Sequence, residues 1–263
     1  MTLLKKEDYL FWKTNSYIVL KGMFSDEIES ISNWINDIKT WPVDMSKWLN
    51  SYEMNNSSVL SRIENFVPYH TQLASVLLNQ SLLEIIGSLM EEEALLYKDR
   101  INFKPPGGGA HAAHQDGVAY ESSALEKFHD DKAPFISVLI SIDPATSENG
   151  CFEIAEDWPI ENLDILPMER PYPENPNFSK IAQKYEDELS WKQIQTNPGD
   201  VILFTERLPH RSKKNSSSKS RRILYGVYNP ISEGDNRSKY FDDKRKNIND
   251  ARYMVGNPHA PVK

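Results

Sequence analysis

The feature of this sequence that most constrains its fold is a change in hydrophobic period near Ala94. Before that point, apolar residues recur at helical spacing in two stretches, which predicts two amphipathic helices. The first helix should be capped by Ser25, and the second should run from about Thr71 to Met90 with a break near residues 79–81. Residues 1–93 are therefore expected to be mostly helical.

From residue 94 to residue 230 the pattern is typical of short strands. Runs rich in β-branched and aromatic residues are separated by proline and glycine turns, as in a β-sandwich or barrel backed by helices. We expect one domain over residues 1–263, in which a β core of residues 94–230 is followed by a charged tail, residues 231–263, with a short helix. The predicted strands are Leu95–Phe103, Phe135–Ile142, Cys151–Ala155, Asp200–Phe204 and Ile223–Tyr228.

The charge balance and the cysteine count exclude several classes of protein. With 38 acidic and 30 basic residues, the formal net charge is −8, which argues against nucleic acid and anionic membrane as partners. Cys151 is the only cysteine, so an intramolecular disulfide is excluded and a reducing cytoplasm is the expected compartment. We expect no membrane span, which needs roughly 18–20 apolar residues, and no signal peptide.

The triplet His114-Gln115-Asp116 is the sharpest chemical feature. Residues two apart on a strand point to the same face, so His114 and Asp116 are placed to offer an imidazole and a carboxylate to one metal ion. His210 follows a predicted strand and is the candidate third ligand. Two histidines and one carboxylate on one side of a metal form the ligand set of non-haem Fe(II) oxygenases. His111 lies three residues before His114, a spacing that should point it off this face.

Taken alone, the triplet also fits a simpler interpretation, because chance His-x-Asp pairs are common. Two solvated polar residues after a glycine loop would give the same pattern, and the same ligand types also suit zinc. The remaining histidines have no comparable neighbours, and we expect them to be surface or structural residues: His70, His129 and His259.

A basic segment follows His210. Six basic residues and no acid lie between positions 211 and 222, which would suit a solvated loop or a nucleic-acid patch. In the strand that ends this segment, Arg221 and Ile223 share one face and Arg222 lies on the other. An arginine on the inward face needs an anion, and a dicarboxylate co-substrate would satisfy it through a bidentate guanidinium–carboxylate pair.

Other catalytic patterns are incomplete. The glycine run at residues 107–109 lacks the Gly-Lys-Ser/Thr ending of a P-loop, so we interpret it as a turn that leads into the His114 strand. A serine hydrolase would need a Gly-x-Ser-x-Gly elbow, which the sequence lacks. Cys151 has apolar neighbours and should be packed rather than nucleophilic. The proline-rich segment Pro159–Tyr185 is expected to be a long loop or insertion beside the site.

Several ordered motifs together resemble one family. The chain is similar to the phytanoyl-CoA dioxygenase family of Fe(II)/2-oxoglutarate-dependent oxygenases, and within it to bacterial 2-aminoethylphosphonate dioxygenases. The similarity extends from Tyr17 to Lys246 and implies a double-stranded β-helix, a cupin-like jelly roll, with helices packed outside. The motifs that carry it are Arg100–Pro105, His114–Asp116, Ile140–Cys151, Pro198–Val201, His210-x-Ser212 and Arg221, and for the narrower group Ser232–Asp235 and Tyr240–Arg245.

The resemblance implies a set of cofactors and the residues that hold them. Fe(II) is the implied metal, with 2-oxoglutarate and O2 as co-substrates. The implied iron ligands are His114, Asp116 and His210, and the implied 2-oxoglutarate contacts are Arg221, Ser212 and Asn102. Arg222 is the alternative clamp, because a shift of one residue in strand register exchanges the two faces.

The implied reaction is hydroxylation of a small polar metabolite with release of succinate and CO2. Family halogenases replace the ligand carboxylate by a small residue, so Asp116 favours hydroxylation. A 2-aminoalkylphosphonate or a quaternary-ammonium analogue is the first candidate substrate, and an amino acid or a natural-product intermediate is the alternative. A non-catalytic jelly roll that binds a metal or ligand, and a zinc hydrolase with the same ligands, are rival functions.

The substrate side of the site is where this chain departs from the family pattern. Many members have a Pro-Gly-Ser-His-like turn where this sequence reads Ile154–Pro159. Tyr120 and Trp158 are candidates to line the substrate pocket, although core packing would explain both equally well. Three basic residues near the site could assist the approach of an anionic group: Arg211, Lys213 and Lys214.

Overall fold

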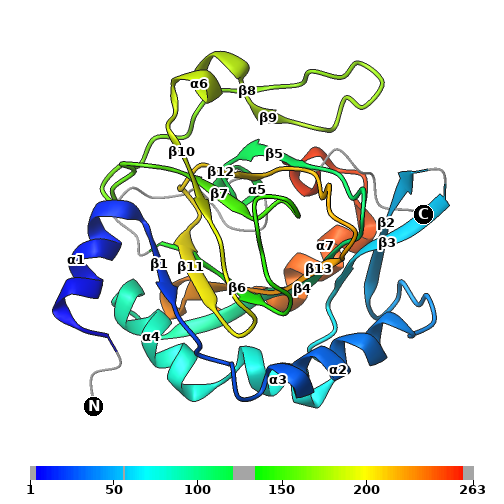
Figure 1. Cartoon of the computed structure of the whole chain (residues 1–263), viewed down its shortest axis with the longest axis horizontal. Coiled ribbons are helices and arrows are strands. Elements are labelled where there is room, and N and C mark those ends of the chain that lie inside the picture. The colour runs from blue at the N-terminus through cyan, green and yellow to red at the C-terminus, as the bar shows by residue number, and fades with distance from the viewer. Residues whose placement is uncertain (1–3, 56, 121–133, 257–263) are drawn as a thin grey trace.

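The computed structural model describes residues 4–55, 57–120 and 134–256, and within them two antiparallel sheets face each other without closing into a barrel (Figure 1). The larger sheet has the strand order β1 (Tyr17–Leu20), β11 (Val201–Thr205), β6 (Ile136–Ser141), β13 (Arg221–Pro230), β4 (Ala94–Lys104), β3 (Ser57–Glu64) and β2 (Leu49–Asn55). The smaller sheet has the order β10 (Trp191–Ile194), β7 (Phe152–Ala155), β12 (His210–Ser212) and β5 (His111–His114). This arrangement confirms the predicted cupin-like core with supporting helices.

Helices cover the outer face of the larger sheet (Figure 1). They are α2 (Ile28–Lys39), α3 (Thr71–Leu77) and α4 (Gln80–Met90), while α1 (Lys6–Asn15) precedes β1. The apolar stripe of α2, which contains Ile31 and Ile35, joins the outward side chains of the sheet in one buried cluster. Each such side chain contributes roughly 1.5–3 kcal/mol through burial, so this layer is the main source of stability.

A second apolar cluster lies between the two sheets. Leu139 of β6 and Ile202 of β11 pack there against Phe152 and Ile154 of β7. This cluster fills only part of the space between the sheets. The remaining part is lined by polar and charged side chains and forms the pocket described below.

The N-terminal part of the chain is less helical than expected. β1 pairs with β11, and β3 pairs with β4, so strands from residues 1–93 extend a sheet formed mainly by later ones. Helix α2 begins at Ile28, and the hydroxyl of Ser25 lies 3.5 Å from the carbonyl oxygen of Pro198 instead of capping the helix. β1 was missed because its partner β11 lies far away in sequence, whereas β2 and β3 pair with each other and were missed because they contain many polar residues.

The stretch Thr71–Met90 is interrupted as predicted. Asn79 caps α4 by accepting a hydrogen bond from the backbone N–H of Leu82 at 3.2 Å. By length and apolar composition alone, the whole stretch would suffice to cross a membrane, which corrects the expectation that no such run exists. In the structure, however, its apolar side chains pack in the core beneath the larger sheet, as those of Leu73 and Ile86 do.

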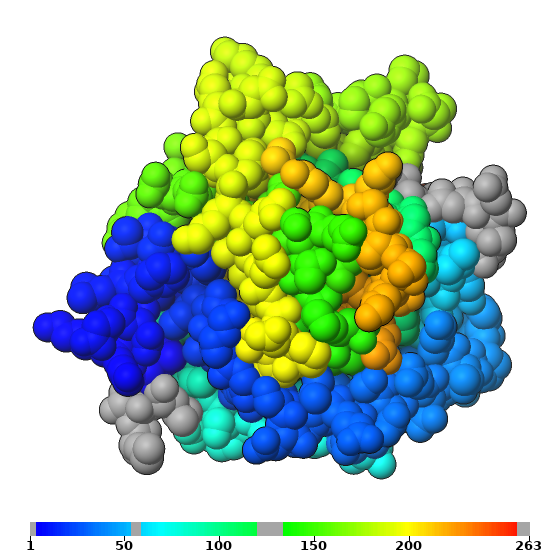
Figure 2. All heavy atoms as spheres, viewed as in Figure 1, coloured from blue at the N-terminus to red at the C-terminus, as the bar shows by residue number. Residues whose placement is uncertain are grey.

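The segment Pro159–Tyr185 contains a short two-stranded ribbon in place of a continuous loop. It consists of β8 (Met168–Glu169) and β9 (Lys180–Ile181), and α6 (Gln183–Glu188) follows it. This segment projects from the body of the molecule at the top of the view (Figure 2). The tail contains the predicted helix, α7 (Arg237–Lys246), between two short 3-10 turns at Ile231–Glu233 and Ala251–Tyr253. Cys151 is buried, as expected.

We predict that Gly199→Ala destabilises the protein more than Gly107→Ala. Both glycines have positive φ, +86° and +76°, so both substitutions carry the left-handed strain of about 1–2 kcal/mol. A Cβ on Gly199 would also lie 2.5 Å from the backbone nitrogen of Ser25, whereas a Cβ on Gly107 meets nothing within 4 Å. Urea unfolding should show an additional loss of about 1–3 kcal/mol for Gly199→Ala. Equal losses in the two variants would contradict this account.

Candidate metal centre and its pocket

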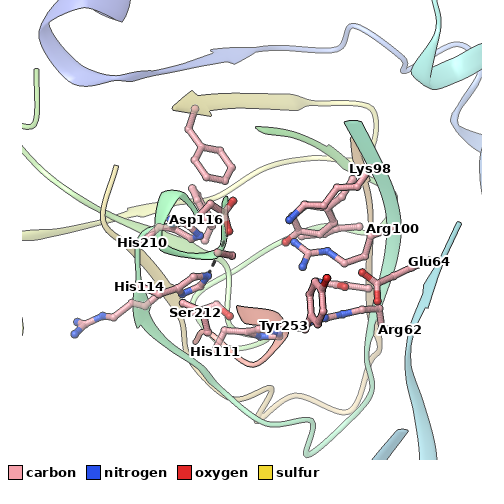
Figure 3. A pocket seen from close by; sticks show the side chains of 18 of the residues that line it. Arg62, Glu64, Lys98, Arg100, His111, His114, Asp116, His210, Ser212 and Tyr253 are labelled. Carbon is pink, nitrogen blue, oxygen red and sulfur yellow. Dashed lines mark ion pairs between the residues drawn. The ribbon is translucent and has the colours of Figure 1, made fainter. Parts of the chain in front are cut away.

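The structure brings together the three side chains predicted as metal ligands (Figure 3). His114 at the end of β5 lies directly opposite His210 at the start of β12, and Asp116 follows β5. The candidate ligand atoms of His114, Asp116 and His210 all lie within 4.8 Å of one another. Nε2 of His114 and Oδ1 of Asp116 are 3.8 Å apart. Two imidazoles and one carboxylate at this spacing suit one divalent ion.

Hydrogen bonds fix the orientation of each ligand. Nδ1 of His114 lies 2.7 Å from the carbonyl oxygen of Ala112, and Nδ1 of His210 lies 2.9 Å from that of Leu208. An Nδ1–H that donates to a carbonyl leaves the Nε2 lone pair available for a metal. Asp116 accepts a 3.0 Å hydrogen bond from the hydroxyl of Ser137 through Oδ2. Its other oxygen therefore remains on the side of the histidines.

Hydrogen bonds of the Gln115 side chain hold the triplet in place at the end of β5. Its amide points away from the two ligands and donates to the carbonyl oxygens of Asp164 and Arg207 at 2.8 and 2.6 Å. Its side-chain oxygen accepts a 2.8 Å hydrogen bond from the N–H of Leu166. The segment after Trp158 is thereby connected to the backbone between His114 and Asp116, which places part of the predicted insertion beside the site.

The surroundings keep all three ligands deprotonated. Burial and the neighbouring His210 lower the pKa of His114 to about 3, and burial also lowers the pKa of His210. For Asp116, burial acts in the opposite direction, but His210 and Lys98 lower the pKa well below its usual value. Neutral imidazoles and an ionised carboxylate are the forms that bind metal ions.

Arg221 lies on the inner face of β13 and lines the same pocket as the triad. It is 2% exposed, its Nη1 donates to the carbonyl oxygen of Gly150, and its Nε–H has no partner among the described residues. Arg222 lies on the opposite face, where Asp143 accepts from its Nε and Nη2 at 2.9 and 2.7 Å. The predicted strand register is therefore present in the structure, and Arg222 is bound by Asp143 on the other face of β13.

Two further predicted contacts lie beside Arg221. Ser212 and Asn102 both line the pocket, and the side-chain oxygen of Asn102 is buried without a partner in the described structure. Lys104, directly opposite Arg221 on β4, donates to the hydroxyl of Ser212 at 2.8 Å. Burial and the neighbouring Arg221 lower the pKa of Lys104 to about 6. This corner therefore brings a guanidinium, a hydroxyl and an amide together on one side of the pocket.

Several pocket residues were not found from the sequence. Alternate positions of β4 point inward, and on either side of the predicted Asn102 they carry Lys98, Arg100 and Lys104, which were not predicted. The outward positions between them include the apolar residues Ile101 and Phe103. This alternation of polar and apolar residues along β4 is visible in the sequence and would have predicted that the strand lines the pocket.

His111 corrects one expectation. It lines the pocket together with His114, although a regular strand would turn residues three apart to opposite faces. The reason is an irregularity in the β5–β12 ladder, where Ser212 pairs with His111 but His210 pairs with His114. The extra residue on β5 is a β-bulge, which reverses the alternation of faces.

Other expectations are altered by ion pairs and packing. Arg211 is bound by Glu153 and Glu186 at 2.8 and 2.7 Å, and Lys213 lies 3.3 Å from Glu153. These two cations are thus paired with surrounding acids, although Arg211 is among the residues that line the pocket. Trp158 packs in the cluster between the sheets and is not among the residues that line the pocket.

The remaining aromatic and histidine candidates have different outcomes. The side chain of Tyr120 lies outside the described residues, as do His129 and His259. His70 is structural, because its Nδ1 caps α3 by accepting from the N–H of Leu73 at 3.2 Å.

The C-terminal tail forms one wall of the pocket, which the sequence did not indicate. Tyr240, Lys244 and Tyr253 line it, and Gly256 lies so close behind His114 that an added Cβ would be 2.2 Å from Nδ1 of the imidazole. Lys244 binds Glu64 of β3 at 2.7 Å, and both side chains are buried. This ion pair joins the tail to the larger sheet.

Comparison with known proteins identifies similar sequences. Residues 12–223 match the family model described as phytanoyl-CoA dioxygenase. The chain is 34% identical to a protein named 2-aminoethylphosphonate dioxygenase from the uncultured bacterium HF130_AEPn_1, over 94% of this chain and 89% of that one. It is also 34% identical to a methylphosphonate hydroxylase from Gimesia maris, over 90% of this chain and 85% of the relative.

Solved structures share the fold. EctD from S. alaskensis, in a structure with 2-oxoglutarate and 5-hydroxyectoine, has a TM-score of 0.71 and 17% sequence identity, and the match covers 88% of this chain and 77% of EctD. A carbocyclase described as non-haem and α-ketoglutarate-dependent, SnoK from nogalamycin biosynthesis, has a TM-score of 0.62 and 16% identity, with 86% and 84% of the two chains covered. At these identities the likeness concerns the fold.

We predict that Glu64→Gln destabilises the protein by about 3 kcal/mol near pH 7, because it leaves the Lys244 ammonium buried without its partner. Burial opposes ionisation of Glu64, but Lys244 and Arg62 lower its pKa from 4.5 to about 2. Since this pKa is lower in the folded state, the stabilisation is complete above about pH 4.5 and is lost as the pH falls toward 2.

Urea unfolding of the wild type and Glu64→Gln between pH 3 and pH 8 tests this prediction. The difference in unfolding free energy should shrink in the acid range, and the double variant Glu64→Gln/Lys244→Met should recover part of the loss. A difference that is the same at pH 3 and pH 7 would show that the ion pair is not its cause.

Proposed function

This chain belongs to the phytanoyl-CoA dioxygenase family, and on that premise we propose that His114, Asp116 and His210 hold its iron and that a small organophosphonate is its substrate. It is an Fe(II)/2-oxoglutarate-dependent dioxygenase that hydroxylates a small metabolite with release of succinate and CO2. The observation that carries the proposal is the buried His-Asp-His cluster that shares one pocket with the partly unsatisfied guanidinium of Arg221.

The ligand residues would present three donor atoms on one side of the ion. When bound, the iron supplies the oxygen chemistry that couples decarboxylation of 2-oxoglutarate to hydroxylation of the substrate. The carbonyl groups behind the imidazoles and the Ser137 hydroxyl hold the donors in place before the metal arrives. Phe152 and Phe204 pack against the His210 ring, with ring centroids 5.2 and 4.9 Å away, and exclude water from that side.

Arg221 would clamp the distal carboxylate of 2-oxoglutarate. Its buried Nε–H lacks a partner among the described residues, as expected for a donor that awaits an anion. Asn102 would contact the co-substrate through its amide N–H groups, because its side-chain oxygen is an acceptor and cannot bind a carboxylate. The side-chain nitrogen of Lys104 donates to the oxygen of Ser212, so the hydroxyl proton of Ser212 is free to point toward an acceptor in the pocket. A guanidinium and a hydroxyl on one carboxylate would fix the orientation of the co-substrate.

The names of the curated relatives support a phosphonate as the substrate. Two proteins that are each 34% identical to this chain over most of their length are named for 2-aminoethylphosphonate and for methylphosphonate. The pocket agrees with an anionic substrate, because several of its lining residues are arginines and lysines.

We predict that anaerobic addition of Fe(II) and 2-oxoglutarate produces a weak visible charge-transfer band, and that His210→Ala abolishes it. The matched control is His70→Asn, which removes an imidazole outside the pocket but keeps a side-chain cap on α3. The control should retain the band. Folded wild-type protein that binds Fe(II) but gives no band with 2-oxoglutarate would exclude the oxygenase assignment of this site.

We also predict that Arg221→Ala weakens 2-oxoglutarate binding about hundredfold, because a charge-assisted bidentate contact is lost. Arg222→Ala removes the neighbouring arginine, which faces Asp143 outside the pocket, and should leave the affinity nearly unchanged. Titration of the charge-transfer band with 2-oxoglutarate measures both variants. The opposite ranking would show that the other face of β13 binds the co-substrate.

A further inference from the structure

A second group of cations lines the pocket on the side opposite the metal ligands (Figure 3). Arg100 on β4 is paired in register with Glu64 on β3 and with Tyr225 on β13. Arg62 on β3 is paired with Asn102. Because inward-facing positions alternate along these strands, both guanidinium groups lie on the wall that faces His114 and His210.

The two arginines lack the anionic partners that other pocket cations have. Among the described residues, no hydrogen bond or ion pair joins Arg62 or Arg100 to a carboxylate, and the Nε–H of Arg100 is buried without a partner. Arg62 is only 7% exposed. Glu64 lies on the same strand as Arg62, but its carboxylate is bound by Lys244 at 2.7 Å.

Leaving these charges unpaired is unfavourable. Burial and the positive charge of Arg100 lower the pKa of Arg62, while Glu64 raises it. For Arg100, burial also lowers the pKa, but Tyr225, Asp116 and Glu64 raise it by more, and the guanidinium lies over the Tyr225 ring, 4.4 Å from its centroid. A buried cation without a hydrogen-bonded anion is unfavourable, so the unpaired Arg62 together with the unpartnered Nε–H of Arg100 indicates that an anionic ligand completes this wall. Guanidinium groups suit oxyanions because their N–H groups form a planar fork that donates to two oxygens.

Arg100 lies away from the corner assigned to 2-oxoglutarate, whereas Arg62 is in register with Asn102 and lines a small cavity together with Arg221 and Lys104. Arg221 is paired in register with Lys104, whereas Arg100 lies four residues earlier on β4. At about 3.3 Å per residue, the two positions are roughly 13 Å apart along the strand. One small dicarboxylate clamped at Arg221 would therefore leave Arg100 available for a second anion, and Arg62 lies between the two positions, opposite Asn102.

We propose that Arg62 and Arg100 form the seat for the phosphonate group of the substrate. This inference rests on the proposed function, and it assigns substrate recognition to residues on β3 and β4 instead of the basic segment after His210. A phosphonate has three oxygens and more negative charge than a carboxylate, which matches two guanidinium groups. Its carbon chain would then extend across the pocket toward the metal ligands.

The test measures phosphonate and 2-oxoglutarate binding separately in the same variants. Arg62→Gln and Arg100→Gln should each raise the dissociation constant for methylphosphonate about tenfold to hundredfold, measured by calorimetry on the anaerobic Fe(II)·2-oxoglutarate protein. The affinity for 2-oxoglutarate, titrated through the charge-transfer band, should change less than about threefold. Arg62→Lys should restore part of the phosphonate affinity, and Arg170→Gln, at an exposed arginine, is the matched control.

Two outcomes would overturn the assignment. If Arg62→Gln and Arg100→Gln weaken 2-oxoglutarate and spare methylphosphonate, this wall binds the co-substrate. If wild-type protein binds ethylamine as tightly as methylphosphonate, the pocket does not select an anion. This comparison needs only the wild-type protein, so it remains valid if a variant fails to fold. Failure of the oxygenase assignment would appear instead as a missing charge-transfer band. In that case, calorimetry with metal-free protein still measures whether Arg62 and Arg100 bind methylphosphonate.

Discussion

The central strands β4 and β13 have to meet two incompatible environments, and the rest of the molecule follows from this constraint. Their outward side chains, such as Ile101 and Leu224, must be apolar because helices cover that face. Their inward side chains, such as Arg100 and Arg221, are charged because the other face lines the pocket. Between Arg221 and Val227, before the irregularity in the β13–β4 ladder, two-residue alternation meets both demands, so a slip of one residue there would bury charges beneath the helices and remove them from the site.

Ion pairs inside the pocket also determine where the C-terminal tail packs against the larger sheet. Some cations are neutralised by acids of the protein, as Lys244 is by Glu64 and Arg211 is by Glu153. The tail residue Lys244 therefore contributes both a pocket wall and an ion pair with the larger sheet. Arg100 and Arg221 keep buried Nε–H groups without partners among the described residues, and we propose that anionic ligands bind there. The overall acidity of the chain, −8, conceals this local positive interior.

Local patterns predicted much of this arrangement. Spacing alone put His114 and Asp116 on one side and separated Arg221 from Arg222, because alternation is a property of the strand itself. The same rule failed for His111, where a bulge in β5 adds one residue to the ladder. It also failed to reveal β2 and β3, whose sequences contain many polar residues and whose partners are each other and the much later β4.

By itself, the sequence determined the alternating faces of the strands, the helix break at Asn79 and the identity of the candidate metal ligands. These features depend on residues close together in the chain, so local stereochemistry encodes them. Only the tertiary structure decided which charges are satisfied. It showed that Arg211 is neutralised by acids while Arg62 is not, and that the tail closes the pocket behind His114. Such pairings join residues far apart in sequence, and burial fixes their partners only when the sheets and the tail have come together.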